Sequence, residues 1–145
     1  MSAADELAQR CADAMLLRDD AARELGMQIA EMREGYAALT MTVRPEMTNG
    51  HDVCHGGMLF ALADTAMAYA SNSRNGINLA MNASIEFLAP GYKGDTVKAV
   101  ATEVHRSGRT GAYNVKVENQ SGDIIAWFKG RTYQVKGQVI DDESS

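Results

Sequence analysis

The order of apolar and polar residues along the chain predicts two helices and six strands. Leu7, Cys11 and Met15 recur at helical spacing near the start of the chain. They predict an amphipathic helix over residues 5–25, which Gly26 ends as a C-terminal cap.

Alternation of core-facing and outward-facing positions predicts strands. Residues 36–44 alternate Ala37, Leu39, Met41 and Val43 with positions that include threonines, which is the period of a half-buried strand. Turn residues separate the other predicted strands, which are 27–33, 77–88, 95–105, 110–118 and 124–135.

A second predicted helix, residues 58–69, is apolar nearly all round and follows a His-Gly-Gly run at 55–57. A helix that is apolar on every face is buried. The pattern therefore predicts an α+β fold in which an antiparallel sheet wraps around this central helix. One curved sheet covers about half of a helix, so we expect a second subunit to cover the rest.

Length and composition set the class of protein. A chain of 145 residues is one domain, which we assign to residues 1–140, with an acidic tail expected to be disordered at 141–145. The net charge of -5 argues against binding to nucleic acid or to an anionic membrane. The chain has no signal-like leader and no apolar run of ~18 residues, and its two cysteines form no CxxC motif, so we expect a cytoplasmic protein.

One acidic residue, Asp64, interrupts the apolar helix. Burying an unpaired carboxylate costs several kcal/mol. Either a nearby donor such as Thr65 satisfies Asp64, or Asp64 lies at an opening where desolvation raises its pKa and strengthens it as a base.

The glycines before this helix are a second candidate. Free N–H groups at a helix N-terminus stabilise a negative oxygen, so Gly56 and Gly57 suit an oxyanion-type site; the alternative is a tight turn that needs glycine for its dihedral angles. Gly56 and Asp64 are eight residues apart, or roughly 12 Å along one helix. Groups that act on one carbonyl each lie about 3 Å from the reacting atoms, so Gly56 of one subunit would have to face Asp64 of another.

Two other chemistries involve the preceding loop. His51, Asp52, Cys54 and His55 are metal-ligand types, but the loop lacks an HExxH pattern and we expect no metal site. Cys54 beside His55 suggests a thiol nucleophile, although adjacent residues rarely point toward one another.

Asn49-Gly50-His51 and the run Cys54-His55-Gly56-Gly57 through Asp64-Thr65-Ala66 resemble the signature of hotdog-fold acyl-CoA thioesterases, with the closest match in the phenylacetic-acid degradation (PaaI) family. The resemblance covers nearly the whole chain, including residues 85–91, 94–95 and 107–111.

The resemblance implies roles for the candidate residues. The Gly56 N–H would polarise the thioester carbonyl, and Asp64 of the facing subunit would be the nucleophile or the general base. Asn49 and His55 would position the thioester or water, and Thr65 would help to orient the attacking group. Two subunits would join their sheets edge to edge, and these homodimers would pair into a dimer of dimers, a homotetramer.

The resemblance also implies a substrate. Arg109, with Gly108 and Thr110 in the same turn, would meet the phosphates of coenzyme A, and Pro90 and Gly91 would line the substrate site. We expect phenylacetyl-CoA or its ring-hydroxylated derivatives as the substrate, in phenylacetate catabolism. Coenzyme A would be part of the substrate, and we expect no cofactor.

The charge distribution also bears on the identity of the ligand. Residues 91–136 carry eight basic and four acidic residues, which suits a phosphorylated ligand, although most of these charges are equally expected on solvated strand faces. The alternative function is a non-catalytic acyl-CoA binding protein or a hydratase-like one. Hydratases of this fold pair an aspartate with a histidine a few residues later, and no histidine follows Asp64 before His105, which favours hydrolysis.

Overall fold

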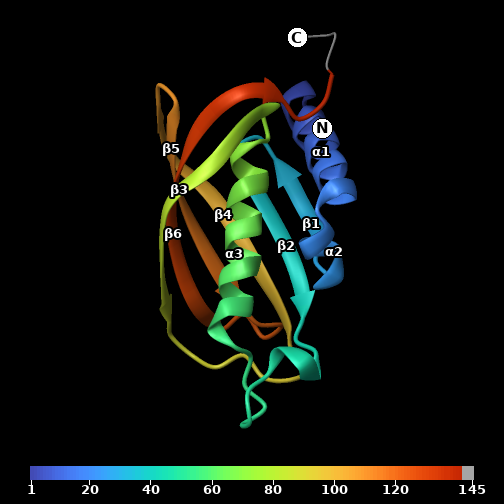
Figure 1. The fold of residues 1–145 in the computed structure, drawn as a ribbon, viewed down its shortest axis with the longest axis vertical. Coiled ribbons are helices and arrows are strands. Elements are labelled where there is room, and N and C mark those ends of the chain that lie inside the picture. The colour runs from blue at the N-terminus through green and yellow to red at the C-terminus, as the bar shows by residue number, and fades with distance from the viewer. Residues whose placement is uncertain (142–145) are drawn as a thin grey trace.

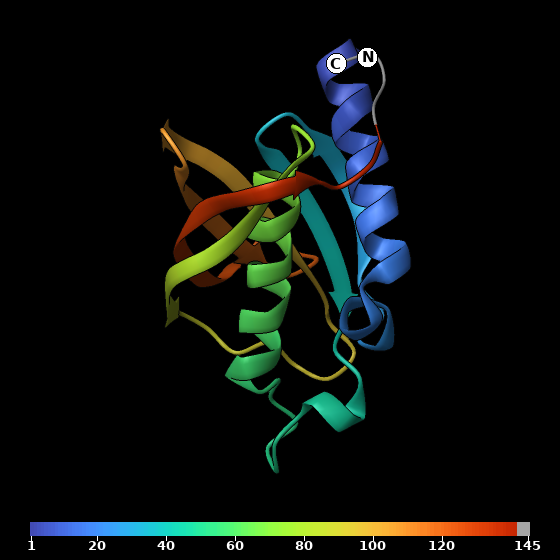
Figure 2. The ribbon, with the colours of Figure 1, turned by 45° about the horizontal axis from the view of Figure 1, so that its top comes forward.

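The computed structural model describes residues 1–141 as a six-stranded antiparallel sheet that curls around one helix, α3 (Figures 1 and 2). The strand order in the sheet is β1-β2-β4-β5-β6-β3. In chain order the elements are α1 (Ala3–Arg18), α2 (Asp20–Glu24), β1 (Gln28–Arg33), β2 (Tyr36–Thr42), a 3-10 turn (Pro45–Met47), α3 (Gly56–Ser71), β3 (Gly76–Phe87), β4 (Thr96–Ser107), β5 (Thr110–Glu118) and β6 (Ile124–Gln138).

The predicted α+β hotdog arrangement is confirmed, with all six strands found near their expected bounds. Asp141 is exposed and has no regular structure, and the rest of the expected acidic tail, residues 142–145, lies outside the described residues. None of the helices in residues 1–141 is both long and apolar enough to cross a bilayer.

The first helix was predicted as one element over residues 5–25. That prediction is wrong at Asp19, where the helix is interrupted. The chain forms two helices because the Asp19 carboxylate accepts a hydrogen bond from the N–H of Ala22 at 3.1 Å and so caps a new start. Gly26 ends the second helix with a φ of +73°, as the C-cap prediction requires. The break brings Asp19 next to α3, where the Tyr69 hydroxyl donates to it at 3.2 Å.

α3 is covered on one side only within this chain. The side toward the sheet is fully buried, and it consists of Leu59, Leu62, Ala63, Ala66, Met67, Tyr69 and Ala70. The opposite side is only partly buried, and we call Phe60, Ala61, Asp64, Thr65 and Ala68 the open stripe. At its edge, the Phe60 ring also meets Phe128 of β6, with 5.2 Å between the ring centroids. The sheet alone therefore leaves this apolar helix half covered, as the sequence pattern predicts.

The sheet ends at β1 on one side and at β3 on the other within the described chain. β3 has twelve residues, and its side chains Leu79, Met81 and Phe87 are between 45% and 55% exposed. A long edge strand with exposed apolar side chains is a template for pairing with another strand. The edge beside the open stripe thus has the properties of a pairing surface.

Candidate functional site

The start of α3 carries two backbone donors with no acceptor. Among the hydrogen bonds of residues 1–141, none uses the N–H of Gly56 or of Gly57, and the N-cap residue His55 makes no side-chain cap. The first turns of α1 and α2 differ, because Ser2 and Asp19 cap them with side-chain oxygens. The α3 N–H groups, at the positive end of the helix dipole, are therefore available to a polar group of a ligand.

Gly56, the first of these donors, borders a pocket of about 450 Å³. Its walls come from the loop before α3, from α3 itself and from the end of β3 with the residues after it, and they are Val53, Cys54, Gly56, Leu59, Phe87, Leu88, Ala89, Pro90 and Gly91. The Cys54 N–H donates to the Gly91 carbonyl at 2.7 Å, which fixes the two sides of the pocket together. Pro90 and Gly91, expected in the substrate site, thus lie beside Gly56.

Asn49 organises the loop that leads to α3. Its side-chain oxygen accepts the N–H of His51 at 2.8 Å and that of Val53 at 3.2 Å. The side-chain NH₂ group has no acceptor among residues 1–141 and can donate to a ligand. His55 is exposed at the same end of the helix, and its N–H donates to the Met47 carbonyl at 2.9 Å.

Asp64 lies two turns further along α3, on the open stripe. Its carboxylate has no hydrogen bond or ion pair among residues 1–141, and the Thr65 hydroxyl donates to the Ala61 carbonyl at 2.7 Å instead. The interpretation that Thr65 satisfies Asp64 is therefore wrong. Burial, and secondly the charge of Asp19, raise the pKa of Asp64 above its ordinary value.

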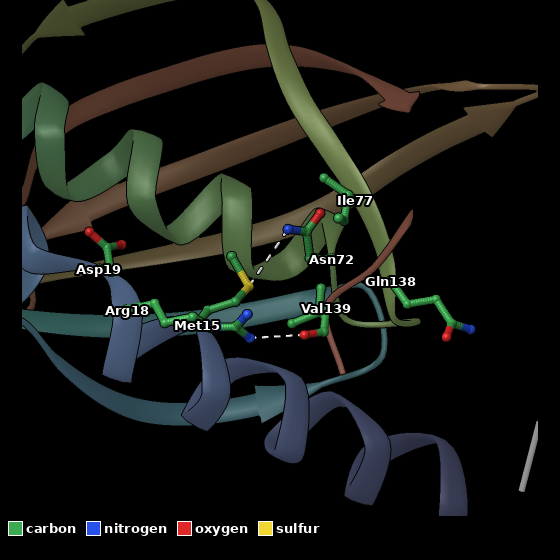
Figure 3. Close-up of a pocket in the computed structure, with 7 residues that line it drawn as sticks. All are labelled: Met15, Arg18, Asp19, Asn72, Ile77, Gln138 and Val139. Atoms are coloured by element: carbon green, nitrogen blue, oxygen red, sulfur yellow. Dashed lines mark hydrogen bonds between the residues drawn. The ribbon is translucent and has the colours of Figure 1, made fainter. Parts of the chain in front are cut away.

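Asp19, which contributes to this electrostatic environment, borders a second pocket of about 410 Å³ between α1 and the far end of α3 (Figure 3). There the Asn72 amide donates to Met15 Sδ at 3.6 Å, and Arg18 donates to the Val139 carbonyl at 2.8 Å. Neither Gly56 nor Asp64 lines this pocket, so it is separate from the one at the start of α3.

Arg109 lies in the tight turn between β4 and β5. Gly108 has a φ of +59°, which the turn requires, and the Thr110 hydroxyl donates to the Ser107 carbonyl at 3.0 Å. The exposed Arg109 side chain lines a third hollow of about 510 Å³ together with Gln134, Val135 and Lys136. This hollow has two cationic groups on its rim, which suits a phosphate.

Within one chain the candidate residues occupy three separate places. Asn49, His55, Gly56, Pro90 and Gly91 gather at the start of α3, and Asp64 and Thr65 lie at its middle. The turn with Gly108, Arg109 and Thr110 lies at the opposite end of the sheet, because β5 pairs its first residue with Tyr133, far along β6 from the Ala126 that pairs with Phe87. The continuous helix from 56 to 71 keeps Gly56 and Asp64 roughly 12 Å apart, as predicted.

The sequence pattern assigned no site role to Phe87, Asp19 or Lys136, although Phe87 falls within residues 85–91 of the resemblance. Phe87 reaches Gly56 only through the return of β3 along the sheet, and Asp19 reaches α3 only through the break between α1 and α2. Lys136 stood out only as one of eight basic residues in its half of the chain.

The two alternative chemistries of the loop find little support. Burial raises the pKa of the Cys54 thiol, which lowers its thiolate fraction and its strength as a nucleophile. In the described part of the chain no three His, Cys, Asp or Glu side chains come together in a group that could hold a metal ion.

Comparisons with known proteins agree with this geometry. Residues 51–126 match the model of the thioesterase superfamily. The chain is 44% identical over 131 residues to the acyl-coenzyme A thioesterase PaaI of Escherichia coli (strain K12), covering 90% of this chain and 94% of that protein.

Solved structures of thioesterases have folds similar to that of this chain. The structure of the E. coli PaaI protein from the phenylacetic acid degradation operon has a TM-score of 0.91 at 43% identity, over 92% of this chain and 97% of that one. A hypothetical thioesterase from Streptococcus pneumoniae TIGR4, solved with coenzyme A, has a TM-score of 0.73 at 26% identity, over 77% of this chain and 87% of that one.

The raised pKa of Asp64 predicts a pH-dependent cost in stability. Because the folded pKa lies above the unfolded one, the folded state binds more protons, and stability falls as the pH rises through the folded pKa of Asp64. We expect Asp64→Asn to be more stable than the wild type at pH 7, because the neutral amide avoids the cost of burying a charged carboxylate. The gain should vanish near pH 3, below both pKa values.

Urea denaturation at pH 7 and at pH 3, at one protein concentration, measures this difference. Asp20→Asn is the control, because the Asp20 side chain is 89% exposed. An Asp64→Asn protein no more stable than the wild type at pH 7 would contradict the environment described for this carboxylate.

Proposed function

The chain belongs to the thioesterase superfamily, and from this premise we propose that it hydrolyses an acyl-CoA thioester to the free acid and coenzyme A. The observation that carries the proposal is the unpartnered Asp64 carboxylate on the open stripe of α3, on the helix whose first N–H groups are also free. A general base and a carbonyl-polarising donor are what thioester hydrolysis needs.

Two subunits bring these groups together in the proposed enzyme. If the β3 edges of two copies pair antiparallel about a two-fold axis, the two α3 helices run in opposite directions. The start of one α3 then comes to the end of the sheet where its neighbour carries Arg109. The long apolar edge of β3 and the open stripe support this arrangement, in which each site combines Gly56 of one subunit with Asp64 of the other. Pairing of dimers into a tetramer is a further proposal.

Asp64 acts as the general base in the proposed reaction. It takes a proton from a water molecule, whose oxygen attacks the thioester carbon while the Gly56 N–H stabilises the negative charge on the carbonyl oxygen. The carbon–sulfur bond then breaks, and the coenzyme A thiolate leaves and is protonated. The raised pKa of Asp64 supports this role, because a base works best when its pKa approaches the working pH.

The other candidate residues act by positioning. The Asn49 amide and the His55 imidazole are placed to hold water or the thioester at the start of α3. Thr65 acts as an acceptor only, since its proton is used by the Ala61 carbonyl. Gly108 and Thr110 shape the turn that presents Arg109 to a phosphate.

The name of the E. coli relative and its operon support phenylacetyl-CoA, or a ring-hydroxylated form, as the substrate in phenylacetate catabolism. Coenzyme A arrives as part of the substrate, and no cofactor is proposed. A cytoplasmic location stays a prediction.

Removing the base should stop the reaction. We expect Asp64→Asn to lower kcat for phenylacetyl-CoA by about 10²- to 10⁴-fold, measured as thiol release. The control Asp20→Asn should keep wild-type turnover. Wild-type turnover in Asp64→Asn would overturn the assignment.

A single turnover in ¹⁸O-labelled water then separates the base from a nucleophile. A general base leaves the Asp64 carboxylate unlabelled, because the water oxygen goes directly to the product acid. Label in the Asp64 carboxylate would instead show that it attacks the thioester and is released by water.

Arg109 should affect binding more than chemistry. We expect Arg109→Ala to raise KM for an acyl-CoA about fivefold while kcat changes less than twofold, because an exposed charge pair contributes about 1 kcal/mol. The matched control is Arg23→Ala, which removes an exposed arginine from α2. An unchanged KM in Arg109→Ala would remove Arg109 from the coenzyme A site.

A further inference from the structure

The ring of Phe87 lies with its tip against the backbone of Gly56. A Cβ added at Gly56 would lie 2.6 Å from Phe87 Cζ, 2.9 Å from Cε1 and 3.1 Å from Cε2. Real Cβ atoms do not approach other atoms this closely, so no side chain fits at position 56 while the ring stays in place.

Backbone conformation does not explain this glycine. Gly56 is absent from the residues with positive φ, so an alanine could adopt its dihedral angles. At the neighbouring Gly57, an added Cβ would meet nothing within 4 Å. The interpretation that both glycines are needed for the dihedral angles of a tight turn is therefore wrong for this structure, and the Phe87 ring is the group that a side chain at position 56 would meet.

The position of Phe87 is fixed by its strand. Phe87 pairs with Ala126 on β6, and the N–H groups of the next two residues, Leu88 and Ala89, both donate to the Ile125 carbonyl, at 2.9 and 3.2 Å. The side chain is nevertheless 55% exposed, and it lines the 450 Å³ pocket beside the free N–H groups of α3. A large aromatic surface is thus held open next to the donor that the proposed reaction uses.

We propose that Phe87 determines acyl specificity: its ring is the apolar wall beside the Gly56 N–H against which the acyl group of the thioester packs. This inference rests on the proposed function and assigns to the same site a residue that the sequence did not indicate. Aromatic rings attract other rings in offset or edge-to-face geometry beyond simple area burial. The wall therefore favours an arylacyl group over a short aliphatic one.

The first test compares two substrates. We expect Phe87→Ala to lower kcat/KM for phenylacetyl-CoA about tenfold relative to kcat/KM for butyryl-CoA, within the range for one apolar contact in a pocket. The matched control is Val104→Ala, which removes an apolar side chain that is 59% exposed on β4. An unchanged ratio of the two kcat/KM values in Phe87→Ala would overturn the specificity role.

The second test combines substitutions at Phe87 and at Gly56. Gly56→Ala keeps the backbone N–H, so its effect is steric, and we expect it to lower kcat/KM by more than tenfold by displacing the Phe87 ring into the pocket. In the Phe87→Ala background, Gly56→Ala should have less than a twofold effect. Equal losses in both backgrounds would mean that the glycine serves the ligand and that the ring does not demand it.

Phe87→Tyr adds an oxygen at Cζ, the atom nearest Gly56, so it should behave like Gly56→Ala. Full activity in Phe87→Tyr would contradict the end-on contact. Thermal unfolding of each variant checks that it folds, and the same contact predicts that Gly56→Ala lowers Tm in the wild type but not in Phe87→Ala. That stability readout fails or succeeds independently of whether the wild type releases thiol from any acyl-CoA.

Discussion

The distance between Gly56 and Asp64 along one unbroken helix is the constraint on which the account of this protein depends. A helix is rigid over two turns, so the donor at its start and the carboxylate at its middle stay roughly 12 Å apart in every copy of the chain. No loop movement within one subunit can bring both groups to one carbonyl. A second copy with its helix reversed removes the difficulty, and the uncovered side of α3 and the edge of β3 are the surfaces such a copy would need.

A comparison with Glu103 shows that the surroundings of the Asp64 carboxylate are unusual. Glu103 accepts two hydrogen bonds from Arg74, each 2.9 Å long, and these bonds hold the pKa of Glu103 below its ordinary value. Asp64 has no such partner, and burial acts in the opposite direction on its pKa. The Glu103 carboxylate, which joins a loop to the sheet, is thus paired. The Asp64 carboxylate, which lies on the open stripe, has no partner among residues 1–141. Unpaired groups of this kind mark functional sites because they cost stability.

Sequence patterns predicted most of the fold. Alternation located β2, turn residues bounded the other strands, and the apolar run with glycines before it located α3, since all these signals are local. The break at Asp19 was missed because the carboxylate that caps α2 looks like any other acid of a helix. The order of the strands in the sheet could not be predicted from the sequence either, because β3 pairs with β6 and not with the next strand in the chain.

Some residues of the candidate site could be predicted from the sequence, and others could not. Asp64 and Gly56 could be predicted because each breaks a local rule, a charge in an apolar helix and a glycine pair at a helix start. The contact between Phe87 and Gly56 joins residues 31 positions apart and depends on how β3 returns beside the start of α3, so no spacing in the sequence reveals it. Phe87 reads as one more apolar residue of a strand until the sheet is built.

Subunit complementation tests the shared site most directly. Asp64→Asn and Gly56→Ala chains, co-expressed with different affinity tags and purified by both tags, form hybrids in which one site combines the intact Gly56 of one chain with the intact Asp64 of the other. We predict that two parents of low activity yield a hybrid with about half the wild-type turnover per dimer, since one of two symmetric sites is restored. A hybrid no more active than its parents would show that the two residues do not meet across an interface.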